Sequence, residues 1–215
     1  MDAKELIARR VAKMLKDGDF VNLGIGLPTE VANYIPEGVE VIFQSENGMV
    51  GLGPKDPNNI DPELCNAGGQ PVTIISGGCF FDSATSFALI RGGHVDYTVL
   101  GALEVDEHGN LSNWVVPGKM VPGMGGAMDL VVGAKKVIVA MTHTQKGAHK
   151  IKKECTLPYT AINQVDIIVT ELGYMEVTEK GIVVKELAEG VTKEQIQEAT
   201  GCELHFADDL KVMEI

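Results

Sequence analysis

A single carboxylate stands on a predicted tight turn at residues 44–48, Gln-Ser-Glu-Asn-Gly. Residues 39–43, Val-Glu-Val-Ile-Phe, predict a buried strand before it, because β-branched and aromatic residues favour strands. Asn47 and Gly48 both tolerate positive φ and predict the turn itself. Ligands bind at the carboxyl ends of strands in open α/β sheets, so Glu46, Asn47 and Gly48 are candidate substrate-contacting residues. The alternative is an ordinary surface turn that contains a glutamate.

A second candidate site is the stretch 117–126, which holds four glycines and two prolines and therefore cannot form a regular element. Gly125 and Gly126 carry no side chain, so a ligand can approach their backbone N–H groups closely. Small residues with inward N–H groups are what an oxyanion hole requires, that is, a site for the negative oxygen of a tetrahedral intermediate. A flexible connection is the alternative. It is disfavoured because the segment 117–130 interleaves apolar side chains that we expect to be buried, namely Met120, Met124 and Met128.

A third glycine-rich segment, Gly-Ile-Gly-Leu-Pro-Thr at 24–29, follows a predicted strand at 20–23 and precedes a predicted helix. The arrangement is that of a phosphate-binding loop, but Thr29 replaces the third glycine of G-x-G-x-x-G and there is no P-loop lysine. We interpret Gly24 and Gly26 as part of a loop that approaches an anion or a carbonyl group. A tight packing turn is the alternative.

Composition limits the class of protein. The chain has 215 residues, 45% of them hydrophobic and 22% charged, which is ordinary for one large soluble domain spanning 1–215. The net charge of −12 argues against a nucleic-acid partner. The four cysteines and five histidines show no metal-ligand spacing, so no metal is expected. With no signal-peptide core and no apolar run long enough to span a membrane, we expect a cytoplasmic protein.

The remaining patterns predict strands alternating with helices, which favours a mixed, mainly parallel sheet with helices on both faces. The N-terminal helix is predicted to start at a capping Asp2 and to end at Gly18. A hairpin turn is predicted at 106–110, and 182–184 reads as an edge or hairpin strand. Further strands are predicted at 72–75, 96–100, 137–141 and 165–169, and further helices at 29–34, 83–90 and 192–200.

Seven motifs in this order and spacing resemble the beta chain (the B subunit) of the family I, or 3-oxoacid, coenzyme A transferases. The resemblance covers residues 3 to about 203. The motifs are Asn-Leu-Gly-Ile-Gly-Leu-Pro-Thr at 22–29, Gln-Ser-Glu-Asn-Gly at 44–48, Gly-Leu-Gly-Pro at 51–54, Ile-Arg-Gly-Gly-His-Val-Asp at 90–96, Asn-Trp-Val-Val-Pro-Gly-Lys-Met at 113–120, Gly-Met-Gly-Gly-Ala-Met-Asp-Leu at 123–130 and Lys-Glu-Cys-Thr-Leu-Pro at 153–158.

The resemblance implies a coenzyme A transferase or ribose-5-phosphate-isomerase-like α/β fold and a transferase with Glu46 as its nucleophile. It implies that Gly126, or Gly125, gives a backbone N–H to the oxyanion hole. No cofactor is implied beyond coenzyme A as a substrate. The implied partner is the alpha chain of such an enzyme, in a heterotetramer of two alpha and two beta chains (A2B2). The implied substrates are acetoacetyl-, butyryl- or acetyl-CoA with a short-chain carboxylic acid. One departure is Gly69, because some relatives carry a lysine after Asn-Ala-Gly that contacts coenzyme A.

Three other functions remain open at this point. An acyl-CoA hydrolase on the same scaffold would open the same glutamyl thioester with water. A sugar-phosphate isomerase of similar fold would leave the Ser-Glu-Asn-Gly turn and the loop at 123–126 unexplained. A non-catalytic scaffold protein would leave a carboxylate on a glycine-lined edge without a purpose.

Overall fold

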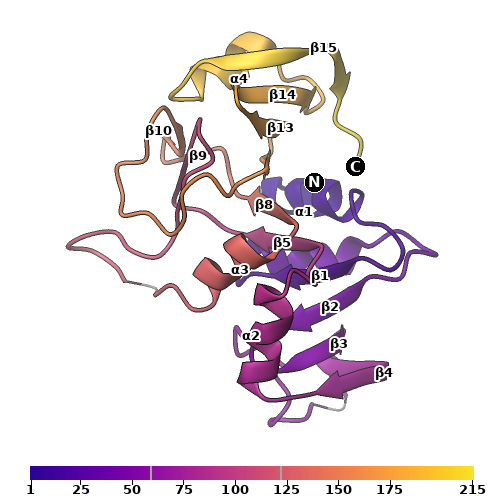
Figure 1. The fold of residues 1–215 in the computed structure, drawn as a ribbon. Helices are drawn as coiled ribbons and strands as arrows, with labels where there is room; N and C mark the ends of the chain where they lie inside the picture. The colour runs from indigo at the N-terminus through magenta and orange to yellow at the C-terminus, as the bar shows by residue number, and fades with distance from the viewer. Residues whose placement is uncertain (59, 122) are drawn as a thin grey trace.

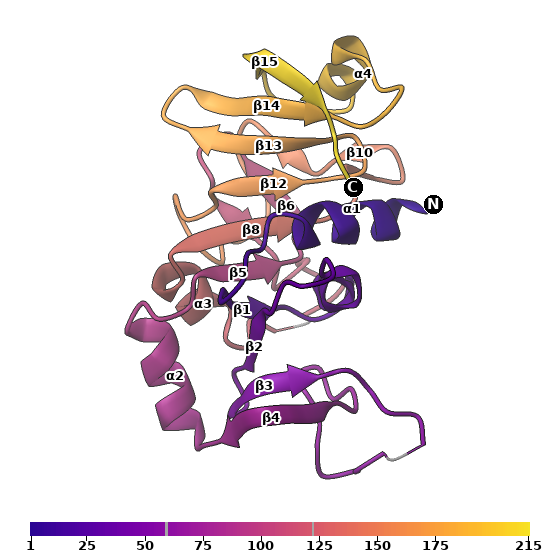
Figure 2. The same ribbon diagram turned by 90° about the vertical axis from the view of Figure 1, so that its right-hand side faces the viewer.

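The computed structural model describes residues 1–58, 60–121 and 123–215, and its centre is a ten-stranded mixed sheet (Figures 1 and 2). The strand order is β15-β14-β13-β12-β8-β5-β1-β2-β3-β4. The middle strands β12, β8, β5, β1 and β2 run parallel, and antiparallel neighbours extend the sheet on both sides. The strands are β1 (Phe20–Leu23), β2 (Ile42–Ser45), β3 (Met49–Gly53), β4 (Thr73–Phe80), β5 (Tyr97–Leu100), β8 (Lys136–Ala140), β12 (Ile167–Val169), β13 (Gly173–Thr178), β14 (Gly181–Leu187) and β15 (Leu204–Val212).

Helices cover both faces of this sheet, as the sequence predicts. Successive side chains of a strand point to opposite faces, and Val137 and Val139 of β8 join one apolar core while Ile138 and Ala140 join the other. The helix α1 (Ala3–Ala12) and the 3-10 helix η1 (Leu27–Tyr34) pack in the core that contains Ile138. The helices on the opposite face are α2 (Ser83–Arg91), α3 (Ala127–Gly133) and α4 (Lys193–Glu198).

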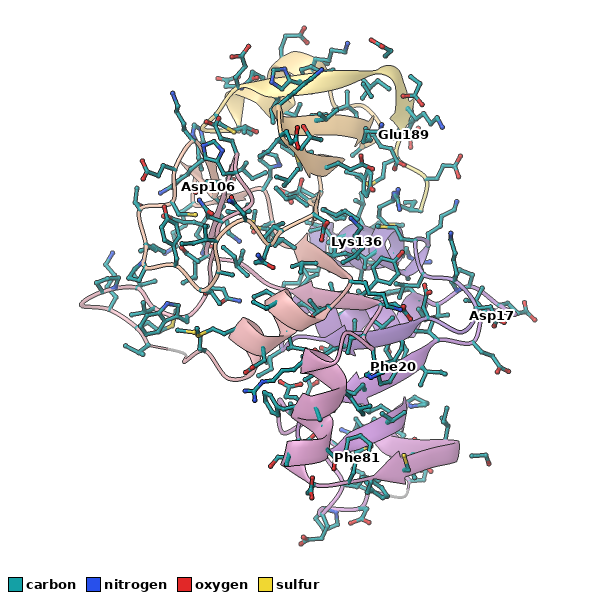
Figure 3. All side chains as sticks on the ribbon, viewed as in Figure 1. Asp17, Phe20, Phe81, Asp106, Lys136 and Glu189 are labelled. Atoms are coloured by element: carbon teal, nitrogen blue, oxygen red, sulfur yellow. The ribbon has the colours of Figure 1, made fainter. Side chains whose placement is uncertain are left out.

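Short strands outside the main sheet complete this second face. The predicted turn at 106–110 joins β6 (Glu104–Asp106) to β7 (Leu111–Ser112), which confirms a hairpin there, and β11 (Ile151–Lys152) pairs with β6. A separate pair is β9 (Thr144–Gln145) with β10 (Ala148–His149). Asp106 (labelled in Figure 3) is fully buried and accepts hydrogen bonds from the backbone N–H groups of His108, Asn110 and Cys155. This carboxylate therefore anchors the small sheet.

Several predicted boundaries are wrong, for local reasons. The helix α1 ends at a C-cap on Lys13 rather than at Gly18, because bonds of the i to i−3 type tighten its last turn. The strand predicted at 39–43 is β2 at 42–45, because its pairing starts where β1 starts, with Phe20 opposite Ile42. The strand predicted to stop at Ile75 continues to Phe80. The hairpin strand predicted at 182–184 is confirmed as part of β14, which pairs with β13 in a hairpin and is no edge strand because β15 pairs with its other side.

Glycines allow β4 to continue past its predicted end. Gly51 of β3 has a φ of +84°, and a Cβ there would lie 2.8 Å from the Cα of Gly78 on β4. The pairing of β3 with β4 shifts register at this point. The two strands therefore approach closely at a bulge that only glycines permit. None of the helices in the described ranges is long and apolar enough to cross a membrane.

A buried histidine ties the end of β8 to two other segments. His143 is fully buried, with Nδ1 2.8 Å from the hydroxyl of Thr170 and Nε2 2.9 Å from that of Thr200. The Thr200 hydroxyl donates its own proton to the carbonyl of Ile196, so it can only accept from His143. Nε2 therefore carries the ring proton and Nδ1 accepts from Thr170. Burial, followed by repulsion from His149 and Lys150, lowers the pKa of His143 to about 4.

We expect this histidine to make the fold less stable in mild acid. The folded-state pKa of about 4 lies below the ordinary value of 6.5, so the unfolded chain binds the proton more readily. The stabilising contribution is complete above pH 6.5 and is lost as the pH falls towards 4, by roughly 3 kcal/mol in total. Urea unfolding at several pH values measures this. The slope of stability against pH should flatten in His143→Gln but not in His205→Gln, because His205 is exposed. Equal slopes in all three proteins would contradict the prediction.

Candidate functional site

The turn that carries Glu46 joins β2 to β3, and this hairpin positions it. Ser45 pairs with Met49, so the three residues 46–48 form the turn. Because β2 runs parallel to β1, Glu46 lies at the carboxyl edge of the parallel strands, as the sequence predicts. Gly48 has a φ of +118°, and a Cβ at this position would overlap the carbonyl oxygen of Phe81. Phe81 lies between β4 and α2 (Figure 3). The turn therefore packs so closely against this backbone that only glycine fits at position 48.

Behind Glu46 lies a chain of buried polar side chains that sequence reasoning missed. The Nδ2 group of Asn22 on β1 donates to Glu46 Oε2 at 3.1 Å and to Gln44 Oε1 at 2.7 Å. Gln44 Nε2 donates to the hydroxyl of Ser86 on α2 at 2.8 Å. Asn22 and Ser86 are fully buried, and Gln44 is 2% exposed. The sequence did hold a signal for this chain of side chains, because Asn22 and Gln44 are polar residues inside the short strands β1 and β2.

The end of the glycine-rich loop, at Gly126, lies next to the side chain of Glu46. A Cβ at Gly126 would lie 3.4 Å from Cγ of Glu46 and 3.3 Å from Cζ of Phe87. An ion pair of 2.6 Å between Arg91 of α2 and Asp129 of α3 holds the two helices together beside it. The structure therefore brings together Glu46 and Gly126, which are far apart in the sequence. Within the described part of the chain, the Gly126 N–H makes no hydrogen bond.

The other predicted glycines and Asn47 lie around this pair in different ways. The N–H of Gly24 donates to the carbonyl of Val99 at 2.8 Å, so Gly24 packs against β5. Gly26 and Gly125 have φ values of +90° and +52°, and a Cβ on either would meet no atom within 4 Å. The Asn47 side chain donates to the carbonyl of Cys65 at 2.8 Å and holds the segment 65–70 beside the turn.

A hollow of about 510 Å³ opens next to the turn. Its wall includes Gln44 and Ser45, which directly precede Glu46, together with Leu23, Ile25 and Gly68. A larger hollow of about 920 Å³ has His108 and Tyr159 in its wall, and neither wall includes a predicted site residue itself. We place the candidate site at Glu46 and Gly126, beside the smaller hollow, because the wall of that hollow reaches the two residues that directly precede Glu46.

Two of the three methionines that the sequence predicts to be buried, Met120 in the glycine-rich loop and Met128 in α3, differ from expectation. Met120 and Met128 are more than half exposed, whereas the sequence predicts burial. Val121 and Val132 are exposed as well, at 69% and 72%. The reason is geometric, because the loop and the outer side of α3 lie at the surface and no element in the described ranges covers these side chains. These four residues, Met120, Val121, Met128 and Val132, are called the apolar rim below.

The arrangement of these groups suits acyl transfer. A carboxylate on a rigid turn can attack a carbonyl carbon, and a backbone N–H beside it can hold the oxygen of that carbonyl. In the described ranges no group of three or more His, Cys, Asp or Glu side chains is placed to hold a metal ion.

Comparison with known proteins points to the coenzyme A transferases. The sequence pattern described as coenzyme A transferase matches residues 4–199. The beta subunit of the acetate CoA-transferase of Haemophilus influenzae is 60% identical, and the alignment covers 100% of this chain and 97% of that protein. The B subunit of the succinyl-CoA:3-ketoacid coenzyme A transferase of Helicobacter pylori is 50% identical, with 93% and 97% covered.

A solved structure shows the same fold. An acyl-CoA transferase from Escherichia coli O157:H7 superposes with a TM-score of 0.81 at 23% identity, over 99% of this chain and 43% of that one. The chain thus spans less than half the length of that solved protein.

The family match and the relatives together define an enzyme of the acyl-transfer class, one that transfers coenzyme A. The chain belongs to the coenzyme A transferase family, and it corresponds over nearly its whole length to relatives named as the beta or B subunits of such enzymes.

Proposed function

We propose that this chain supplies the nucleophile of a transferase that moves coenzyme A from a short-chain acyl-CoA to a free carboxylic acid. The observation that carries the proposal is the meeting of Glu46 with Gly126 at the carboxyl edge of the sheet, where a carboxylate lies beside a backbone N–H that makes no hydrogen bond within the described ranges. The names of the relatives point to acetate and 3-ketoacids as acids, and butyrate is a further candidate.

The proposed reaction has two stages of covalent catalysis. Glu46 attacks the acyl-CoA carbonyl carbon, the C–S bond breaks, and the CoA thiolate leaves from an acyl-glutamyl anhydride. The thiolate then attacks the glutamyl carbonyl and releases the first acid, which leaves a glutamyl-CoA thioester. A second acid reverses both steps, so the kinetics are ping-pong. The Gly126 N–H, with Gly125 beside it, holds the oxygen of the substrate carbonyl as charge develops on it.

The remaining predicted residues act around this centre. Asn47 and Gly48 keep the turn in place, and Gly24 packs against β5. Gly26, where a Cβ would meet no atom within 4 Å, leaves the backbone open to the substrate beside the 510 Å³ hollow. The chemistry needs no metal and no cofactor other than coenzyme A itself. Exclusion of water prevents hydrolysis of the anhydride.

A partner chain completes the site in this proposal. The four side chains of the apolar rim are each more than half exposed, and exposed apolar surface beside a site is what a partner protein covers. The solved relative is also more than twice as long as this chain. We therefore propose an alpha chain as partner, in an A2B2 assembly that works in the cytoplasm.

Peptide mapping of the complex with its alpha chain tests the proposal directly. After treatment with acetoacetyl-CoA and hydroxylamine, we expect a hydroxamate on the peptide that contains Glu46 and none when acetoacetyl-CoA is left out. An unmodified peptide, with binding of acetoacetyl-CoA confirmed, would contradict the covalent mechanism. Release of free coenzyme A at the full rate without any acceptor acid would indicate a hydrolase instead.

A further inference from the structure

The buried side-chain amide of Asn22 donates a hydrogen bond to Oε2 of Glu46, the candidate nucleophile. Its Nδ2 group lies 3.1 Å from Glu46 Oε2, 2.7 Å from Gln44 Oε1 and 3.3 Å from the carbonyl oxygen of Gln44. Asn22 is fully buried in the middle of β1, so no bulk water competes for these contacts. Asn22 is thus a fixed hydrogen-bond donor on the inner side of the candidate nucleophile.

Chemistry fixes which way this amide faces. The backbone carbonyl of Gln44 and the carboxylate of Glu46 can only accept, so the NH₂ end of Asn22 must point to them. The other end of the amide, Oδ1, is buried and has no partner in the described ranges. Its neighbour across the strands, Thr98, also has a buried hydroxyl oxygen without a partner there. The fold therefore leaves a polar atom unsatisfied while it presents the donor to Glu46, a cost typical of functional sites.

Gln44 and Ser86 hold the amide in this orientation. Gln44 turns its Oε1 to Asn22 because its own Nε2 donates to the Ser86 hydroxyl at 2.8 Å. The Ser86 hydroxyl faces the carbonyl oxygen of Ser45 at 3.5 Å, which directs its proton away from Gln44. The chain Ser86, Gln44, Asn22, Glu46 thus links α2 to the carboxylate through three buried side chains.

This inference rests on the proposed function, whose reaction forms tetrahedral intermediates at two different carbon atoms. One is the carbonyl carbon of the substrate, beside Gly126. The other is Cδ of Glu46, which the CoA thiolate or the incoming acid attacks. Each needs its own donor, because the two oxyanions stand on different atoms.

We propose that Asn22 is a catalytic residue that stabilises the oxyanion on Glu46 itself, and that Gln44 and Ser86 are positioning residues for it. When the acceptor carboxylate attacks Cδ of the glutamyl thioester, the C=O electron pair moves onto the oxygen that Asn22 holds. The pair returns, the Cδ–S bond breaks and the CoA thiolate leaves with its electrons. No proton is transferred. A neutral amide suits this role, because a cation would bind the free carboxylate and lower its reactivity.

A single-turnover experiment on the complex with its alpha chain tests this role. The glutamyl-CoA thioester is formed with acetoacetyl-CoA, isolated and mixed with acetate, and its decay is followed by mass spectrometry. In Asn22→Leu, which removes the donor at similar volume, we expect decay slower by about 10²- to 10³-fold. The isotope-edited infrared band of the thioester carbonyl should move to higher frequency, because a donated hydrogen bond weakens that bond. An effect on folding alone would not move the band.

Two further variants separate catalysis from structure. Thr98→Val is the matched control, since Thr98 is buried in the same layer beside Asn22, and its decay rate should stay within about twofold of wild type. Ser86→Ala should lower kcat by about tenfold at unchanged KM for acetoacetyl-CoA, with a smaller shift of the same band.

The outcomes distinguish this inference from the proposed function. A wild-type complex that forms no thioester overturns the proposed function. If the wild-type complex forms the thioester, and Asn22→Leu leaves both the decay rate and the infrared band unchanged, the role of Asn22 is overturned but the proposed function is not. A Thr98→Val variant as slow as Asn22→Leu also overturns it, because the layer rather than the donor would then matter. If Asn22→Leu does not fold, Asn22→Ser, whose hydroxyl is too short to reach Glu46, is judged by the same criteria.

Discussion

Glu46→Gln is expected to abolish coenzyme A transfer, with a loss of at least about 10³-fold in kcat and no change in fold. Glutamine fits the same space and keeps an oxygen that can accept from Asn22, so the buried contacts survive. Its amide cannot form the anhydride, and removal of a nucleophile typically costs this much or more. The measurement is turnover of the complex with its alpha chain, with circular dichroism and urea unfolding to verify the fold.

The control for this substitution is Glu30→Gln. Glu30 lies on η1 in the wall of the 510 Å³ hollow, and its carboxylate accepts a hydrogen bond from Asn33 at 3.0 Å. We expect near wild-type turnover from it, because it does not touch the reacting groups. Turnover by Glu46→Gln above that of an inactive preparation, or an equal loss in Glu30→Gln, would mean that Glu46 is not the nucleophile.

Gly48→Ala is expected to have the second-largest effect, on both stability and activity. The φ of +118° is unfavourable for alanine, and the added Cβ would overlap the carbonyl oxygen of Phe81. That oxygen belongs to the backbone between β4 and α2 and cannot move without shifting both elements. We expect a loss of about 3 kcal/mol or more in the free energy of unfolding, together with a displaced Glu46. Urea unfolding and turnover measure the two effects.

Gly18→Ala separates backbone strain from steric overlap. Gly18 also has a positive φ, +82°, but a Cβ there would meet nothing within 4 Å. We expect this variant to lose only about 1–2 kcal/mol and to keep its turnover. If Gly48→Ala loses no more stability than Gly18→Ala does, the steric overlap with Phe81 does not matter and the prediction is wrong.

Local patterns were sufficient for the pieces of the site. Glu46 follows a strand and precedes Asn-Gly, and short-range preferences alone predict a carboxylate on a turn there. The glycine-rich loop is equally local, because four glycines and two prolines exclude a regular element. The alternation of strands and helices also predicted the mixed sheet with two covered faces, which the structure confirms. Boundaries such as that of β2 failed, because pairing with β1 decides where that strand begins.

Only the tertiary structure decided how the pieces act together. Glu46 and Gly126 meet because the order of the strands brings the β2–β3 turn to the start of α3. The buried chain of Asn22, Gln44 and Ser86 joins two strands and a helix, and hydrogen bonds between distant segments leave no periodic signal in a sequence. The prediction that Met128 is buried was wrong because the sequence does not show which surface covers a side chain. Apolar character predicts that a side chain will be covered, but it does not say whether this chain or another one covers it.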